Sequence, residues 1–261
     1  MSVNAMDYQN APDGSRLAIN EWVSEKTRDR INDIMAPGSV TRDTRLVLVN
    51  AVYFKAQWLE EFSEGATRDA DFLTSGGETV KVRMMSAVRK VSYNETDDAQ
   101  AVKLLYARGS FSMTVILPKK RDGLSKFEAK LNAKTLDEIC SWNSARVELN
   151  IPKFKAENTF DVVDAMRSLG MKSAFDGRTA DFSLMDGRKD LVIDAAVHKA
   201  FVEVDEKGTE AAAATAISVS RLTAAMPEGA PVMFKADHPF IFIIRHEQSG
   251  AILFMGRVTK P

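Results

Sequence analysis

The sequence has few cysteines and histidines, two residue types common in catalytic and metal sites. Its 261 residues include one cysteine, Cys140, and three histidines, and their spacing fits neither a zinc site nor a disulfide. The motifs of serine hydrolases, zinc proteases, P-loop proteins and dinucleotide-binding folds are all missing. We therefore expect this chain to be no enzyme, with no catalytic residue, no metal and no cofactor.

The sequence also has no excess of one sign of charge and no long apolar run. The formal net charge is −1, from 35 basic and 36 acidic residues, so no basic field points to nucleic acid. No apolar run reaches the ~18 residues that predict a membrane span. Residues 1–10 have neither the basic start nor the apolar centre of a secretory signal. The composition, 45% hydrophobic and 27% charged, favours one globular domain over residues 1–261.

The pattern of apolar residues predicts strands with a few helices, an α+β chain. The run RLVLVNAVYF at Arg45–Phe54 is typical of a strand buried on both faces, and Leu191–Val204 is similarly apolar. Further strands are predicted over 79–85, 88–93, 101–106, 111–117, 147–154, 232–234, 240–245 and 251–258. Helices are predicted over 15–34, 124–131, 135–142 and 159–169.

One stretch fits neither a finished strand nor a stable helix. It is Val204–Met226, VDEKGTEAAAATAISVSRLTAAM. At a period of two, one face of residues 209–219 carries only small or apolar, uncharged side chains, and no proline interrupts it. Such a segment suits pairing between two existing strands, since proline would remove a hydrogen-bond donor and a charge would be buried unpaired. Its four consecutive alanines favour a helix equally well.

Two motifs in this part of the chain resemble a known family. EKGTEAAAATA, followed by HPFIFIIRHEQSGAILFMGRV at 238–258, resembles the hinge and carboxyl terminus of the serpins, which are loop-inserting protease inhibitors. LVLVNAVYFKAQWLEEF at 46–62 resembles their central strand and the corner at its top. The resemblance covers about 19–261. It implies the serpin fold: a large central sheet with a mobile reactive loop at about 206–231, further sheets and surrounding helices.

The amino-terminal helices and two sheet strands of that fold, about a third of it, have no counterpart before Met1 in this sequence. The strand at Arg45–Phe54 would then have an open edge. We therefore expect the 261 residues, expressed alone, to self-associate through that edge.

The resemblance also implies roles for particular residues. Glu206 resembles the hinge acid that pairs with a lysine, here Lys153. Asn50 and His198 resemble a polar pair that holds the two middle strands together, and the alternative for His198 is an ordinary core histidine with no ligand. Trp58 resembles the tryptophan where the loop first enters the sheet. The implied hinge comprises Glu206, Gly208, Thr209, Glu210, Ala211, Ala212, Ala213, Ala214 and Thr215.

The function that the resemblance implies is inhibition of a serine protease, or of a cysteine protease, by a suicide-substrate mechanism. In serpins the cleaved bond follows the residue fourteen positions beyond the hinge glycine, here Leu222-Thr223, with Arg221 as the alternative. Leu222 suits a chymotrypsin-like or cathepsin-like protease, and Arg221 a trypsin-like one. The alternatives are a non-inhibitory serpin and an inactive fragment that serves as an interaction or structural protein. The resemblance implies an extracellular location, with the cytoplasm as the alternative.

Overall fold

The computed structural model describes residues 3–209 and 229–261. Contacts divide the chain into two compact units, one of residues 1–54 and 157–202 and the other of residues 55–156 and 203–261. Two paired strands, β8 (Phe154–Asp161) and β9 (Ile193–Asp205), contribute residues to both units. That residues 1–261 form a single domain stays a prediction, since the division into two compact units does not test it.

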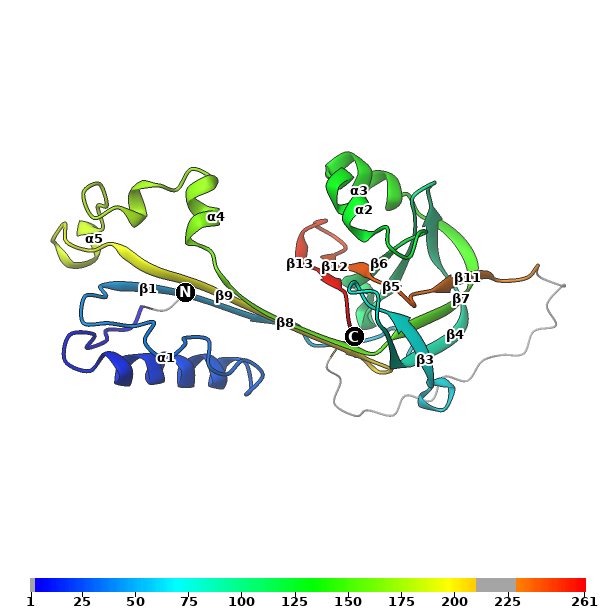
Figure 1. The fold of residues 1–261 in the computed structure, drawn as a ribbon, viewed down its shortest axis with the longest axis horizontal. Helices are drawn as coiled ribbons and strands as arrows, with labels where there is room; N and C mark the ends of the chain where they lie inside the picture. Colours follow the sequence, from blue (N-terminus) through cyan, green and yellow to red (C-terminus); the bar gives the residue numbers. More distant parts are fainter. Residues whose placement is uncertain (1–2, 210–228) are drawn as a thin grey trace. The chain divides into compact units, whose positions relative to one another are not determined.

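The first unit is built on a pair of parallel strands. β1 (Leu46–Tyr53) pairs with β9 from Leu46 opposite Ile193 to Tyr53 opposite Phe201. Figure 1 shows α1 (Pro12–Lys26) on one side of this pair and α4 (Val163–Ser168) with α5 (Ser183–Asp186) on the other. Cover on both sides explains why neither strand alternates cleanly between apolar and polar residues.

Alternate residues of β1 enter two different cores. Val47 and Val49 pack with buried residues of α1 such as Ile19. Leu46 and Leu48 pack instead with Phe175 of the short 3-10 helix η3 (Ser173–Phe175). The two-residue period of a strand thus anchors β1 to both layers.

The helix predicted over 15–34 is shorter than expected, because α1 ends at Lys26. Arg28 and Asp29 adopt left-handed backbone angles, with φ of 54° and 59°, which no α-helix can continue through. Ile31 and Ile34 are nevertheless buried, at 0% and 3% exposure. The apolar residues Ile31 and Ile34 therefore pack in the core from an irregular segment and not from a helix. The helix predicted over 159–169 is similarly reduced to α4, since β8 continues to Asp161.

The second unit contains a large, mainly antiparallel sheet. Its strand order is β11-β7-β4-β5-β6-β12-β13, and β3 also pairs with β4. These strands are β3 (Arg68–Leu73), β4 (Thr79–Glu95), β5 (Ala99–Leu105), β6 (Phe111–Pro118), β7 (Asn143–Pro152), β11 (Val232–Lys235), β12 (Phe240–His246) and β13 (Ile252–Val258). Shorter elements of this unit are β2 (Ala56–Gln57), η1 (Glu64–Ala66), η2 (Ala107–Gly109), α2 (Leu124–Lys130), α3 (Ala133–Ile139) and β10 (Gly208–Thr209).

The two strands predicted over 79–85 and 88–93 form one strand, β4. Ser86 and Ala87, which lie between the predicted strands, continue the pairing with Asn150 and Leu149 of β7. β4 is therefore long enough to pair with β3 at its start and with β5 at its end.

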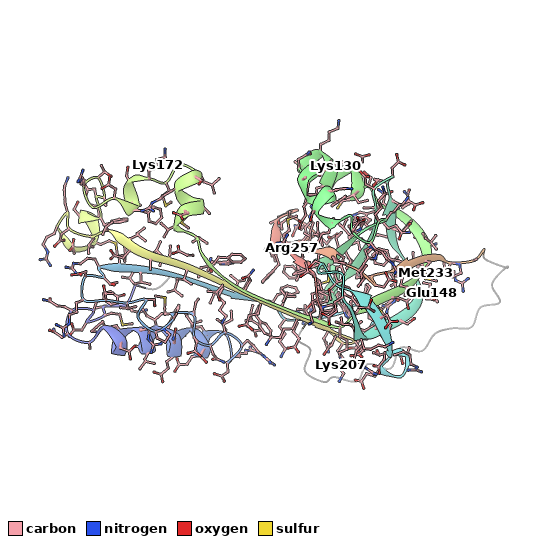
Figure 2. All side chains as sticks on the ribbon, viewed as in Figure 1. Lys130, Glu148, Lys172, Lys207, Met233 and Arg257 are labelled. Atoms are coloured by element: carbon pink, nitrogen blue, oxygen red, sulfur yellow. The ribbon has the colours of Figure 1, made fainter. Side chains whose placement is uncertain are left out.

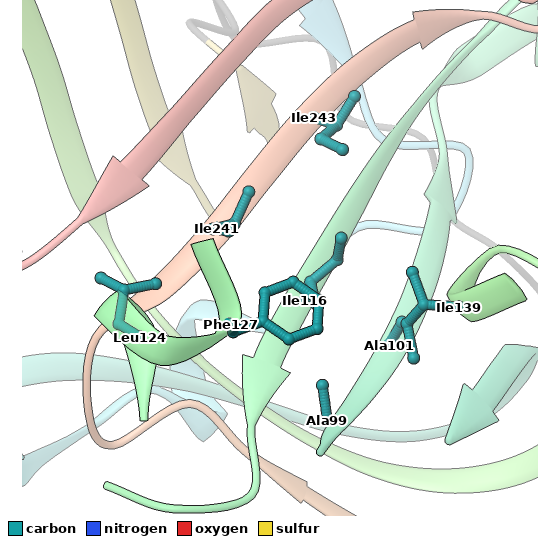
Figure 3. Close-up of a cluster of buried hydrophobic side chains, with 8 residues drawn as sticks. All are labelled: Ala99, Ala101, Ile116, Leu124, Phe127, Ile139, Ile241 and Ile243. Carbon is teal, nitrogen blue, oxygen red and sulfur yellow. The ribbon is translucent and has the colours of Figure 1, made fainter. Parts of the chain in front are cut away.

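One core cluster of this unit lies between the sheet and its two helices. Figure 3 shows Leu124 and Phe127 of α2 and Ile139 of α3 over small and branched side chains of the sheet. The sheet residues in this cluster are Ala99, Ala101, Ile116, Ile241 and Ile243. Cys140 packs against the same cluster, and burial raises the pKa of its thiol. The alternation of strands with a few helices confirms the α+β class.

Candidate functional site

The proposed hinge begins with a tight turn at the end of β9. The Asp205 side chain forms the turn, since its Oδ1 accepts hydrogen bonds from the backbone N–H groups of Lys207 (2.9 Å) and Gly208 (3.2 Å). The chain then reverses into β10, which pairs on both sides. Gly208 lies opposite Asp205 of β9 and Gln57 of β2, and Thr209 lies opposite Val204 and Ala56. The first two residues after the turn are therefore already part of a sheet.

Gly208 can be no other residue in this arrangement. Its φ of +149° is one that side-chain-bearing residues rarely adopt. A Cβ at this position would lie 2.2 Å from the carbonyl oxygen of Ala56 and 2.7 Å from the Cα of Gln57. Both atoms belong to the backbone of β2, so neither can turn aside as a flexible side chain would.

Glu206 is held through both its side-chain carboxylate and its backbone carbonyl. Its carboxylate lies 2.8 Å from the Lys153 ammonium and accepts a 2.7 Å hydrogen bond from the Thr67 hydroxyl. Its carbonyl accepts a 2.8 Å hydrogen bond from the N–H of Phe62. Burial disfavours the charged carboxylate, but the hydrogen bonds from Lys153 and Thr67 outweigh it, so that the pKa of Glu206 is lowered. The pairing with Lys153 is thus present in the structure.

Trp58 binds the turn from its other side. Its backbone N–H donates to the Lys207 carbonyl over 2.9 Å, and its indole N–H donates to the Asp205 carbonyl over 3.0 Å. The indole stacks on the ring of Tyr106, with centroids 4.5 Å apart. The Tyr106 hydroxyl in turn lies 2.6 Å from Oγ1 of Thr209. These contacts form one chain of neighbours from Trp58 through Tyr106 to Thr209 of β10.

Asn50 and His198 lie directly opposite each other in the pairing of β1 with β9. Within the described residues, neither side chain hydrogen-bonds to a protein group. The His198 ring instead stacks on Phe160 of β8, with centroids 6.2 Å apart. The structure brings the two residues together, while their role in holding the strands stays a prediction.

The description resumes at residue 229, and β11 then pairs in parallel with β7. Figure 2 shows Met233 of β11 next to Glu148 of β7, its partner in the register. Several predicted positions lie outside the described residues: Glu210, Ala211, Ala212, Ala213, Ala214, Thr215, Arg221, Leu222 and Thr223. The reactive bond and the rest of the hinge stay predictions.

Three further residues contribute to this site, namely Thr67, Tyr106 and Asp205. Thr67 and Tyr106 carried no signal, since they contact residues 139 and 103 positions away. Asp205 could have been found, because an aspartate shortly before Lys-Gly is a turn signal. Among residues 3–209 and 229–261, no group of three or more metal-ligating side chains comes together. No helix in the same ranges is long and apolar enough to cross a bilayer.

The fold resembles that of solved serpins. The structure of native protease nexin-1 with heparin matches with a TM-score of 0.87 and 31% identity, covering 100% of this chain and 69% of that one. The structure of uncleaved ovalbumin matches with a TM-score of 0.86 and 29% identity, covering 98% of this chain and 65% of that one. The architecture is therefore the serpin fold.

The sequence comparisons agree with the fold. The family model for serpin (serine protease inhibitor) matches residues 1–261. The leukocyte elastase inhibitor of Equus caballus is 40% identical over 98% of this chain and 69% of its own length. Human serpin B3 is 39% identical over 100% of this chain and 67% of its own length. The chain thus spans about two thirds of these relatives, and it belongs to the serpin family.

Proposed function

We propose that this chain inhibits a serine-type endopeptidase as a suicide substrate, by inserting residues 209–219 between β1 and β9. The protease supplies the attacking hydroxyl, so the chain needs no catalytic residue of its own. The observation that carries this proposal is β10, in which Gly208 and Thr209 pair with both β9 and β2. Insertion would extend a strand that has already begun.

The pairing of β1 with β9 explains why insertion is favourable. The two strands are parallel and bonded directly to each other, from Leu46 opposite Ile193 to Tyr53 opposite Phe201. A segment that entered between them antiparallel to both would replace one interface with two. With about 0.5–1.5 kcal/mol for each net hydrogen bond, the additional interface contributes on the order of ten kcal/mol, which makes insertion effectively irreversible.

The proposed reactive bond is Leu222-Thr223, with Arg221 as the alternative. Leucine suits a chymotrypsin-like or cathepsin-like protease, and arginine a trypsin-like one. The names of the relatives support a protease as partner, since the horse protein that is 40% identical is a leukocyte elastase inhibitor. After acylation, insertion would carry the bound protease along with the cleaved strand, and displacement of its catalytic groups by ~1 Å would stall deacylation.

The second candidate is a non-inhibitory serpin or an inactive partial one that acts through interactions. The direct pairing of β1 with β9 favours it, because eight residue pairs must separate before any strand can enter. β1 also lies at the end of its strand order among the described residues, so self-association through its open edge belongs to the same alternative.

One experiment separates the two candidates. The chain is incubated with chymotrypsin, trypsin and leukocyte elastase, and the products are resolved on a denaturing gel after boiling. The proposal expects a covalent complex with at least one protease. Mass spectrometry of the released carboxyl-terminal peptide should then show a start at Thr223, whereas a start at Leu222 would assign the bond to Arg221. Cleavage without a complex would favour the second candidate.

A further inference from the structure

A cavity of about 210 Å³ lies in the second unit, beside the segment that holds the turn. It forms where β4 and β5 stop pairing. Their register begins at Ser92 opposite Lys103, so residues before Ser92 and after Lys103 separate from one another. Trp58, Leu59 and Phe62 line the cavity from the segment that follows β2.

One end of the cavity is polar and cationic. Ser92 of β4 lies opposite both Ser144 of β7 and Lys103 of β5, and residues opposite each other share one face of a sheet. Neither serine hydroxyl hydrogen-bonds to a residue that the structure describes. The Lys103 ammonium is 2.9 Å from Glu247 and keeps two further protons to donate.

The charges around the cavity favour an anion. Three cationic residues line it, namely Arg89, Lys90 and Lys103. Two acids lie beside them: Glu60, whose carboxylate is 3.9 Å from Arg89 and whose side chain is 65% exposed to water, and Glu247, whose carboxylate is 2.9 Å from the Lys103 ammonium. The cations therefore outnumber the acids by one. The positive charges are less exposed, since the side chains of Arg89 and Lys103 are 12% and 19% exposed. Poorly solvated cations gain more from an anionic ligand than hydrated ones do.

The other end of the cavity is apolar, and it is formed by the segment that hydrogen-bonds to the hinge turn. The rim residues Leu59 and Leu105 are 55% and 37% exposed, and Phe62 lies beneath the Arg89 guanidinium. The backbones of Trp58 and Phe62 donate to the carbonyls of Lys207 and Glu206, the two residues of the turn. The wall of the cavity and the support of the hinge are therefore the same segment, 58–62.

We propose that this cavity binds a small amphipathic anion, an aromatic carboxylate, and that its occupancy holds segment 58–62 and with it the hinge turn. The carboxylate lies against Lys103, Ser92 and Ser144, and the aromatic group lies against Leu59 and Leu105. A bound ligand slows separation of the turn from segment 58–62. The consequence for protease inhibition rests on the proposed function, whereas binding and the restraint of the turn do not.

The test uses 4-phenylbutyrate and its uncharged amide as a matched pair of probes. Calorimetric titration of the chain should show the carboxylate binding at least tenfold more tightly than the amide. Hydrogen exchange at the amides of Trp58 and Phe62 should slow by at least threefold with saturating carboxylate. Exchange at Ile243, in the helix-covered core, should not change.

A charge-reversal variant locates the site. Leu105→Glu places an anion on the rim at a half-exposed position, so we expect at least tenfold weaker binding of 4-phenylbutyrate with an unchanged melting temperature. Leu253→Glu is the matched control, because Leu253 is 44% exposed on β13 and does not line the cavity. It should bind as the unaltered chain does.

Two results would overturn the proposal. Equal affinity for the amide and the carboxylate would remove the anion requirement, and equal affinity of the Leu105→Glu and Leu253→Glu variants would place binding elsewhere. Tight binding without slower exchange at Trp58 and Phe62 would contradict the restraint of the turn. None of these readouts uses a protease, so their failure is distinct from failure of the proposed inhibition.

Discussion

The hinge turn and the middle of the β1–β9 pair differ in how much holds them. At the turn, Glu206 forms an ion pair, a side-chain hydrogen bond and a backbone hydrogen bond, and Thr209 is fully buried. At the middle of the strand pair, Asn50 is exposed and no described residue hydrogen-bonds to its side chain. The first region is fixed by specific polar contacts, while the second is held by the backbone ladder and by apolar packing on both faces.

The proposed insertion requires one end of a strand to stay in place while a path opens next to it, and this difference agrees with that requirement. Specific contacts at the turn fix the register, because a one-residue slip would put the wrong face of the inserting strand into the core. At the middle of the ladder, separation of the strands breaks no side-chain hydrogen bond between Asn50 and His198.

Gly208→Ala should damage the hinge more than any other single change. Its Cβ would lie 2.2 Å from the Ala56 carbonyl oxygen, at a φ that alanine rarely adopts, so we expect a loss of ~3 kcal/mol or more in unfolding free energy. Urea unfolding measures this loss. Gly177→Ala is the control, since its Cβ meets nothing within 4 Å, and it should change stability by less than ~0.5 kcal/mol. Equal effects of the two variants would show that β10 is not paired in solution.

Thr209→Arg should convert an inhibitor into a plain substrate. Thr209 is 0% exposed and lies against Tyr106, so an arginine there would bury an unpaired charge, at a cost on the order of several kcal/mol. Thr209→Ser keeps the hydroxyl and should still form complexes. Denaturing gels report the ratio of complex to cleaved chain. Complex formation by the arginine variant at the unaltered level would contradict insertion of this residue.

The two central strands could be predicted from the sequence, and the irregular segments could not. The runs at 45–54 and 191–204 are apolar enough to require burial on both sides. β1 falls within the first run, and β9 starts within the second and ends one residue beyond it, at Asp205. The end of α1 was missed because Arg28 and Asp29 carry no sequence signal for a left-handed backbone. The pairing of Glu206 with Lys153 followed only from the family resemblance. No local pattern links residues 53 positions apart.

Removing the partner of Glu206 should have a smaller effect than the changes at β10. Lys153→Met leaves the buried carboxylate with Thr67 alone, and since the lysine side chain is 38% exposed, we expect a loss of about 1–2 kcal/mol at pH 7. The direction of the pKa shift of Glu206 determines how its contribution to stability changes with pH. In the folded chain the pKa of Glu206 lies below its ordinary value of 4.5. The stabilisation that this carboxylate contributes is therefore complete above about pH 4.5, and it declines as the pH falls further.

Unfolding by urea at pH 7 and at pH 3.5 measures this contribution. The unaltered chain should lose more stability between the two values than Glu206→Gln, which has no proton to gain. If the two chains lost the same amount, the ion pair would not contribute to the stability of the hinge.

The smallest effect is expected at the middle of the strand pair. Asn50→Ala and His198→Ala should each cost less than ~1 kcal/mol, because no side-chain hydrogen bond to a described residue is lost and only the stacking of His198 on Phe160 is removed. Asn20→Ala is the matched control in the same unit, since the buried Asn20 amide bonds both the N–H and the carbonyl of Met35. It should cost at least ~2 kcal/mol, as a buried amide that bonds two backbone groups does. Urea unfolding of all three variants decides the matter. If Asn50→Ala were as destabilising as Asn20→Ala, a side-chain bridge would hold β1 to β9, and separation of the strands would need a specific trigger in addition to the cleaved loop.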